Sequence, residues 1–135
     1  MASLDYALLA EYARVDASGL LTVVGGSFDR VTASGPNAGQ QLYVALRVLL
    51  DHDEDRVPLE VRVSSPGGEY ELGMSAVAEP NRSAEPVDGR FNIMMALGVV
   101  APLPVAGRYA VRVSLDGKLE RELPFVVELS EPVRP

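Results

Sequence analysis

The residues with the clearest capacity for chemistry form an acidic run, Asp51-His52-Asp53-Glu54-Asp55. Hard cations such as Ca²⁺ bind several carboxylate and carbonyl oxygens at once. The candidate ligands in this run are Asp51, Asp53 and Asp55. Glu54 could contribute as well, and so could Asp88 or Asp116 if their loops lie at the same end of the molecule. The spacing does not match an EF-hand, and acidic loops of this kind often serve only to keep a sheet soluble. Calcium binding is therefore an alternative hypothesis.

The side chains that catalysis usually needs are scarce. The chain has no cysteine and one histidine, His52, and it lacks a Gly-x-Ser-x-Gly elbow, so neither a thiolate nucleophile nor a serine triad is expected. Gly117-Lys118-Leu119 falls in a hairpin turn, which excludes a Walker-type phosphate loop. The 19 acidic residues must include close pairs, yet no pair has a pattern typical of glycoside hydrolysis. We predict a protein that is not an enzyme and holds no cofactor.

The charge balance excludes two classes of partner. The formal net charge is −7, with 12 basic residues scattered among 19 acids in 135 residues. Binding a nucleic-acid backbone or an anionic membrane requires clustered cations. The longest apolar run, Ile93 to Leu103, is about half of the roughly 20 residues that span a bilayer, and the start of the chain lacks a signal-peptide pattern. We expect a protein of the bacterial cytoplasm.

The first element is ambiguous between helix and strand. Leu4 to Val15 favours helix on propensity, but Tyr6, Leu8, Ala10 and Tyr12 alternate with a period of two. Asp16 to Gly19 is a turn cluster, and a plain strand follows from Leu20. A β-hairpin is therefore the favoured interpretation, with helix kept open.

The rest of the chain reads as short strands separated by turns. Apart from Arg47, Leu42 to Leu50 is apolar on both faces, as in a strand near the centre of a sheet. The other expected strands are 59–64, 70–76, 91–100, 109–115 and 119–127, the last two joined by a type I′ turn at Asp116-Gly117. With the first hairpin this makes about eight strands. They predict one domain over residues 1–135, with 130–135 as a flexible tail.

Such a pattern predicts an all-β protein. Each strand has an apolar face, and two sheets must bury those faces against each other, so the expected fold is an antiparallel two-sheet β-sandwich, immunoglobulin-like or C2-like. Pro124 and the acids around it are expected to protect the last strand as a sheet edge.

A glycine pair interrupts the second expected strand, Leu20 to Arg30. Gly25-Gly26 costs backbone entropy and packs no side chain, so it predicts a kink where the strand bends or changes sheets. Phe28 would then re-enter the core, and Asp29 and Arg30 could pair across a sheet edge.

The strongest hint of function is the strand Phe91 to Val100, which is apolar on both faces. Either it is a central strand covered on both sides, or one face is a subunit interface. The interface candidates are Gly25, Gly26, Phe28, Met94, Ala96 and Val100. With catalytic residues absent, the favoured hypothesis is a non-enzymatic interaction or assembly module that binds a protein partner or itself as a homo-oligomer.

Two parts of the chain resemble known families. The residues Leu4 to Ala10 and Gly19 to Arg30 resemble an uncharacterised bacterial family, described as a domain of unknown function. The resemblance covers about 30 residues by this reading and implies no catalytic residues. Pro104 to Val127 is similar to the Gly-x-Tyr-x-Val-x-Val closing hairpin of immunoglobulin-like and C2-like sandwiches, which implies architecture rather than function.

Overall fold

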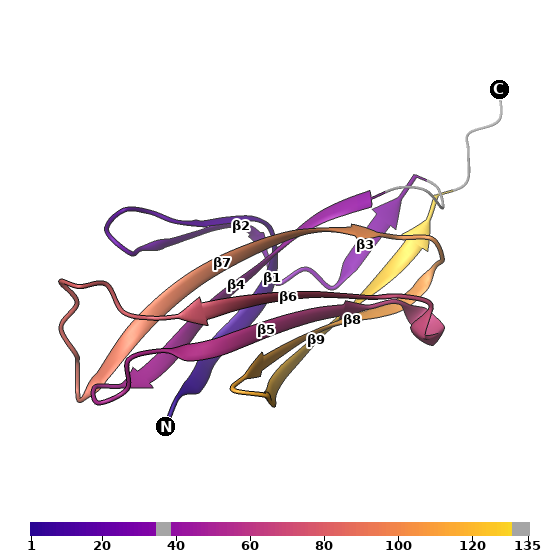
Figure 1. The fold of residues 1–135 in the computed structure, drawn as a ribbon. Coiled ribbons are helices and arrows are strands. Elements are labelled where there is room, and N and C mark those ends of the chain that lie inside the picture. Colours follow the sequence, from indigo (N-terminus) through magenta and orange to yellow (C-terminus); the bar gives the residue numbers. More distant parts are fainter. Residues whose placement is uncertain (35–38, 131–135) are drawn as a thin grey trace.

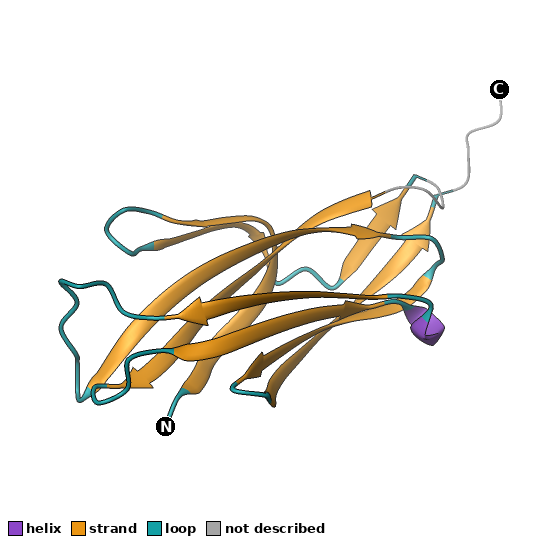
Figure 2. Ribbon diagram, viewed as in Figure 1, coloured by secondary structure: helices purple, strands orange, loops and turns teal. Residues whose placement is uncertain are grey.

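The computed structural model describes residues 1–34 and 39–130, and these form nine strands and one short 3-10 turn (Figure 2). The elements are β1 (Ser3–Val15), β2 (Leu21–Gly26), β3 (Arg30–Ala33), β4 (Gly39–Asp51), β5 (Val57–Ser64), η1 (Pro66–Gly68), β6 (Glu71–Ala78), β7 (Arg90–Pro102), β8 (Gly107–Leu115) and β9 (Lys118–Leu129). The all-β prediction is confirmed, and the ambiguous first element is a strand. Most of the expected tail, 131–135, lies outside the described residues.

Two sheets make up the molecule. Sheet A has the strand order β2-β1-β4-β7, and sheet B has the order β3-β9-β8-β5-β6 (Figure 1). β4 lies between β1 and β7, so the prediction of a central strand there is confirmed. The single helical turn has three residues, and no helix in the described ranges is long and apolar enough to cross a membrane.

The prediction of about eight antiparallel strands is wrong in one respect. The chain from Leu20 to Arg30 does not remain one strand. It leaves sheet A after β2, and β3 pairs in parallel with β9 in sheet B. Arg30 lies opposite Val126, and Ala33 lies opposite Leu129. Consequently β9 is not an edge strand at its end, and Pro124 lies just before the stretch that β3 pairs with.

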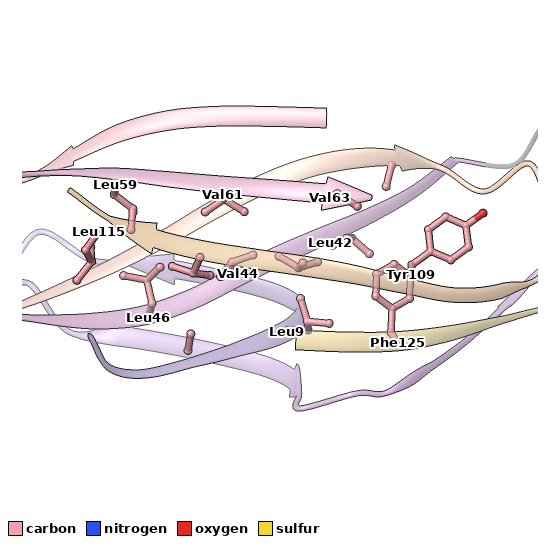
Figure 3. Close-up of a cluster of buried hydrophobic side chains, with 14 of the residues drawn as sticks. Leu9, Leu42, Val44, Leu46, Leu59, Val61, Val63, Tyr109, Leu115 and Phe125 are labelled. Atoms are coloured by element: carbon pink, nitrogen blue, oxygen red, sulfur yellow. The ribbon is translucent and has the colours of Figure 1, made fainter. Parts of the chain in front are cut away.

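The core fills the space between the sheets (Figure 3). Alternate residues of β4 point inward and are fully buried: Leu42, Val44, Leu46, Val48 and Leu50 each have 0% exposure. They face the inward residues of β5 and β8, such as Val61 and Val113. This period of two is what the sequence predicted.

An aromatic cluster closes one end of the core. Tyr109 stacks on Phe125 with ring centroids 5.3 Å apart, and its hydroxyl donates to the carbonyl oxygen of Val105 at 2.8 Å. Phe28 contacts Phe125 edge-on at 6.2 Å. The prediction that Phe28 re-enters the core is therefore confirmed.

The glycine pair marks the crossing between the sheets. Gly25 has φ +61°, and only three residues separate the end of β2 in sheet A from β3 in sheet B. A β-carbon on Gly25 would lie 2.6 Å from Cδ of Glu11. The kink and the change of sheet are confirmed. Arg30, however, pairs with Glu128 of β9 rather than with Asp29, because β3 lies beside β9.

β1 changes partner along its length. Residues Ser3 to Ala10 pair with β4, and within the described chain the residues beyond Ala10 pair with β2 alone. These residues and β2 form a hairpin, here called the arm (residues 11–25), which lies over the outer face of sheet A. Apolar residues of the arm pack on the outer face of sheet A and form a second cluster with residues of β1, β4 and β7. The buried members are Ala10, Ala13 and Ala45, and Leu8, Leu21, Val23, Tyr43 and Ala96 pack against them.

Two turns have the local chemistry expected of them. Asp16 Oδ1 accepts hydrogen bonds from the hydroxyl of Ser18 and from the backbone N–H groups of Ser18 and Leu20, and the hydroxyl bond contributes most to holding the pKa of Asp16 below its usual value. Asp116 and Gly117 both have positive φ, +51° and +79°. That pair of angles confirms the type I′ turn.

The outer face of sheet B carries several ion pairs, and that of sheet A carries the pair Arg47–Asp5. Arg62 binds Glu60 and Glu71, and Arg112 binds Glu122 at 3.1 Å. Hydrogen bonds to Glu60 and then to Glu71 raise the pKa of Arg62. Exposed pairs of this kind contribute little stability, and their main effect is to keep this face in water.

Candidate functional site

The acidic loop brings three carboxylates together. Oxygens of Asp51, Asp53 and Glu54 lie within 4.8 Å of one another, whereas Asp55 is outside this group. The N-terminal ammonium of Met1 binds the carboxylates of Asp51 and Glu54, the latter at 3.0 Å. Two of the three acids therefore already have a cationic partner.

The neighbouring loops lie at the same end of the sandwich, as the sequence analysis required. The backbone N–H of His52 donates to the carbonyl oxygen of Gly89 at 2.9 Å, which places Asp88 nearby. The backbone N–H of Asp116 donates to the carbonyl oxygen of Pro58 at 2.9 Å. Neither Asp88 nor Asp116 adds its carboxylate to the group of three.

The predicted interface residues do not share one surface. Gly25, Gly26 and Phe28 lie at the crossing from β2 to β3, and Phe28 packs on the core. On β7, Ala96 packs against the arm cluster and Met94 is half-buried. Val100 is 61% exposed. The structure therefore brings Met94, Ala96 and Val100 onto one strand face, apart from the other three.

β7 lies at the edge of sheet A rather than at its centre. In the part of the chain that the structure describes, the residues after Arg90 pair with β4 alone, and Arg90 also forms a bridge with Val87. Its core-facing side chains are all half-exposed, although they pack on the core: Phe91, Ile93, Met95, Leu97 and Val99. Their counterparts on β4 are fully buried. The sandwich is therefore open along the β7 side.

The same is true of β6, the nearby edge of sheet B. Leu72, Met74 and Ala76 face the core and remain half-exposed, whereas Val57, Leu59, Val61 and Val63 on the neighbouring β5 are at most 4% exposed. Together the two edges expose an apolar strip of core side chains. This strip is called the seam below: Leu72, Met74, Ala76, Phe91, Ile93, Met95, Leu97 and Val99.

The seam has a defined boundary at each end. At one end the hydroxyl of Tyr70 donates to the carbonyl oxygen of Pro102, which ties β6 to β7. Burial, with a further contribution from Tyr109, raises the pKa of Tyr70 to about 12. At the other end, loop 79–89 connects the two strands. A groove of about 630 Å³ lies there between the arm tip, this loop and the start of β7.

The edge of β7 is long, regular and uncharged. It forms thirteen consecutive pairs with β4 without a register shift, and no residue from Phe91 to Ala101 carries a charge. The other edge strands have six residues in β2, four in β3 and eight in β6. Natural proteins usually shorten, charge or bulge an exposed edge to prevent pairing with other chains. β7 has none of these devices along its centre.

Sequence reasoning placed the interface candidates of this strand on one face. It selected the outer face through Met94, Ala96 and Val100, but the arm packs on part of that face. The core-facing Ile93, Met95 and Leu97 are half-buried, whereas Val100 on the outer face is exposed. The available signal was the uncharged run itself, which identified the strand.

Comparison with protein families assigns the chain to one of them. It belongs to the family of unknown function DUF6941, whose model matches residues 5–128. This confirms the resemblance to an uncharacterised family and extends it over nearly the whole chain. No curated protein matches.

Among solved structures, the chain is similar to the Pseudomonas fluorescens alkylpurine DNA glycosylase AlkC bound to DNA containing an abasic site analog. The identity is 7% and the TM-score is 0.46. The match covers 93% of this chain and 30% of that one, so the chain spans about a third of the length of that structure.

Proposed function

We propose that this protein is a non-enzymatic interaction and assembly module of the bacterial cytoplasm that self-associates through the open β6–β7 side. The observation that carries the proposal is the seam, where core side chains remain half-exposed along both sheet edges. Each half-exposed aliphatic side chain would gain about 1 kcal/mol if association completed its burial. The eight apolar residues of the seam lie on one side of the molecule, which favours an interaction surface over a purely solvated one.

The chemistry of the other surfaces supports the same proposal. The outer face of sheet B carries ion pairs such as Arg62–Glu71 and Arg112–Glu122. The single histidine, His52, is exposed in a loop and bonds to a backbone carbonyl. The net charge of −7 fits a protein partner better than a nucleic acid or an anionic membrane.

We also propose that the sandwich is of the immunoglobulin-like or C2-like type. The β8–β9 hairpin supports this, since it carries the Gly-x-Tyr-x-Val-x-Val sequence and pairs from Gly107 to Leu115 with β9. Folds of this type serve many binding functions, so the architecture is compatible with an interaction module without specifying its partner. An experimental structure that shows a different connectivity would contradict the assignment.

Sedimentation velocity over a concentration series tests self-association. We expect a dimer or larger assembly at high concentration, and Met95→Lys in the middle of the seam should shift it towards monomer, because an ammonium cannot be buried there without a partner. Val24→Lys is the matched control, since Val24 is 53% exposed on the arm. Circular dichroism of both variants checks that they fold. A wild-type protein that stays monomeric at every concentration would sink the proposal.

Calcium binding by the acidic loop is a second candidate function. The convergence of Asp51, Asp53 and Glu54 favours it, whereas the Met1 ammonium already neutralises two of these acids. Calorimetric titration with Ca²⁺ should give heat that Asp53→Asn removes, with Asp88→Asn as the control in the adjoining loop. Absence of both heat and thermal stabilisation by Ca²⁺ would eliminate this candidate.

A further inference from the structure

We propose that the occupant of the β7 edge is β7 of a second copy of this chain. The two strands would run antiparallel about a two-fold axis at Ala96 and join the two A sheets into one eight-stranded sheet. This inference rests on the proposed function and specifies its partner and geometry. It follows from the sequence of the edge, from its charge and from its accessibility.

The sequence of β7 is complementary to itself in this register. In an antiparallel pair, opposed residues point to the same face, and a centre at Ala96 pairs the stretch from Phe91 to Ala101 with itself. On the core side Met95 meets Leu97 of the partner subunit, and Ile93 meets Val99 of the partner subunit. On the outer side Met94 lies opposite Gly98 of the partner subunit.

Charge also favours a second copy. The chain carries a net charge of −7, so most contacts between two copies bring like charges together. The β7 edge is the exception, because it is uncharged from Phe91 to Ala101. Arg90 lies outside the pairing, because its backbone N–H and carbonyl are bonded to Val87. The pairing therefore places no like charges directly opposite each other, an arrangement that would be destabilising.

The edge is accessible to an added strand. The groove of about 630 Å³ is lined by four consecutive residues of β7, Phe91 to Met94. Consecutive residues of a strand point to opposite faces, so the groove reaches both faces of β7 there, between the arm tip and loop 79–85. Added chain would continue the sheet in line with β4 and β7.

The pairing would also bury the seam. With the axis perpendicular to sheet A, the core faces of the two copies stay on the same side, and the open sides of the two sandwiches face each other. Half-exposed residues such as Leu97 and Met74 would then be covered by the equivalent surface of the partner. A single interface of this kind satisfies the free backbone groups and the exposed core together.

The absence of cysteine from the chain makes disulfide trapping a direct test. In this register Asn92 lies opposite Val100 of the partner subunit, and both residues are exposed. Within one chain, positions 92 and 100 are about 26 Å apart at 3.3 Å per residue. Position 92 of one copy is about as far from position 92 of the other copy, and the same holds for position 100. Because a disulfide needs β-carbons about 4 Å apart, the double variant Asn92→Cys/Val100→Cys should oxidise to a covalent dimer.

Each single variant is a matched control. Asn92→Cys or Val100→Cys alone should yield at most about a tenth of the covalent dimer that the double variant yields, since their partner distances exceed disulfide reach. Ala96→Cys, which lies on the axis, should cross-link as a single variant. Val77→Cys on β6, 48% exposed, tests the other edge of the open side.

The outcomes separate this inference from the proposed function. A protein that sediments as a dimer but gives no covalent dimer from the double variant, or cross-links only through Val77→Cys, overturns the β7 pairing and leaves self-association standing. A protein that is monomeric by sedimentation overturns both the β7 pairing and the proposed self-association. This includes the case in which the β7 edge instead binds a strand of a different protein.

Discussion

The ring of Tyr43 on β4 lies directly over Gly98 on β7, so that a β-carbon on residue 98 would be 2.9 Å from Cε1 of the tyrosine. Tyr43 is also held from the other side by Tyr12, whose ring meets it edge-on at 5.3 Å. The arm, the central strand and the edge strand are thus linked through one side chain. Gly98 is required for space, not for an unusual backbone angle.

We predict that Gly98→Val destabilises the fold by about 1–3 kcal/mol, the usual range for overpacking. Gly73→Val on β6 is the control, because a β-carbon there meets only Cγ of Arg62, at 3.9 Å. That change should stay within about 0.5 kcal/mol. Urea unfolding measures both, and equal effects of the two variants would contradict the role given to Tyr43.

Gly25 should combine a backbone requirement with a steric one. Gly25→Ala must adopt φ near +61° and place its methyl group 2.6 Å from Cδ of Glu11. We expect a loss of about 1–2 kcal/mol from the left-handed backbone alone, with a further loss from the contact. In the double variant Glu11→Ala/Gly25→Ala only the backbone part should remain. If Glu11→Ala restores nothing, the contact is not part of the cost.

The aromatic cluster should account for much of the core's stability. Phe125, which is 1% exposed, packs against both Tyr109 and Phe28. Phe125→Ala should cost about 3–5 kcal/mol through the cavity it leaves. Tyr109→Phe removes only the hydroxyl bond to Val105 and should cost about 0.5–1.5 kcal/mol. Denaturant unfolding would reveal an error if the smaller change proved the more damaging.

Tyr70 should make stability sensitive to alkaline pH. Its folded pKa of about 12 exceeds the ordinary value of 10.0 because burial disfavours the phenolate. The folded state therefore binds the proton more tightly than the unfolded chain does. The resulting stability is fully present below pH 10.0 and is lost as pH rises towards 12. Urea midpoints across this window should fall more steeply for the wild type than for Tyr70→Phe, while absorbance titration follows the phenolate.

Local sequence patterns were sufficient to predict most strands and their hairpins. The alternation through Tyr109, Val111 and Val113, followed by Asp116-Gly117, predicted β8, its turn and β9 because both signals are contained within a few residues. The kink at Gly25 was predictable for the same reason. It follows from the backbone freedom of glycine at that position, without reference to the rest of the chain.

Partners far apart in the sequence were not predictable in this way. The four residues of β3 pair with β9, which lies almost one hundred positions later, as in the contact of Arg30 with Glu128. Nothing within β3 specifies a parallel neighbour, because that choice depends on where the chain arrives after crossing between the sheets. The acidic loop behaves similarly, since proximity to the Met1 ammonium comes from the pairing of β1 with β4.

For the candidate site, the sequence by itself determined that Phe91 to Val100 is an uncharged strand with two apolar faces, and that catalytic side chains are scarce. Only the tertiary structure decided that this strand lies at an edge and that its core-facing side chains remain half-buried. The physical reason is that core-facing positions carry the same types of apolar residue in a central strand as in an edge strand. Its burial depends on whether a neighbouring strand is present, which is a property of the whole sheet.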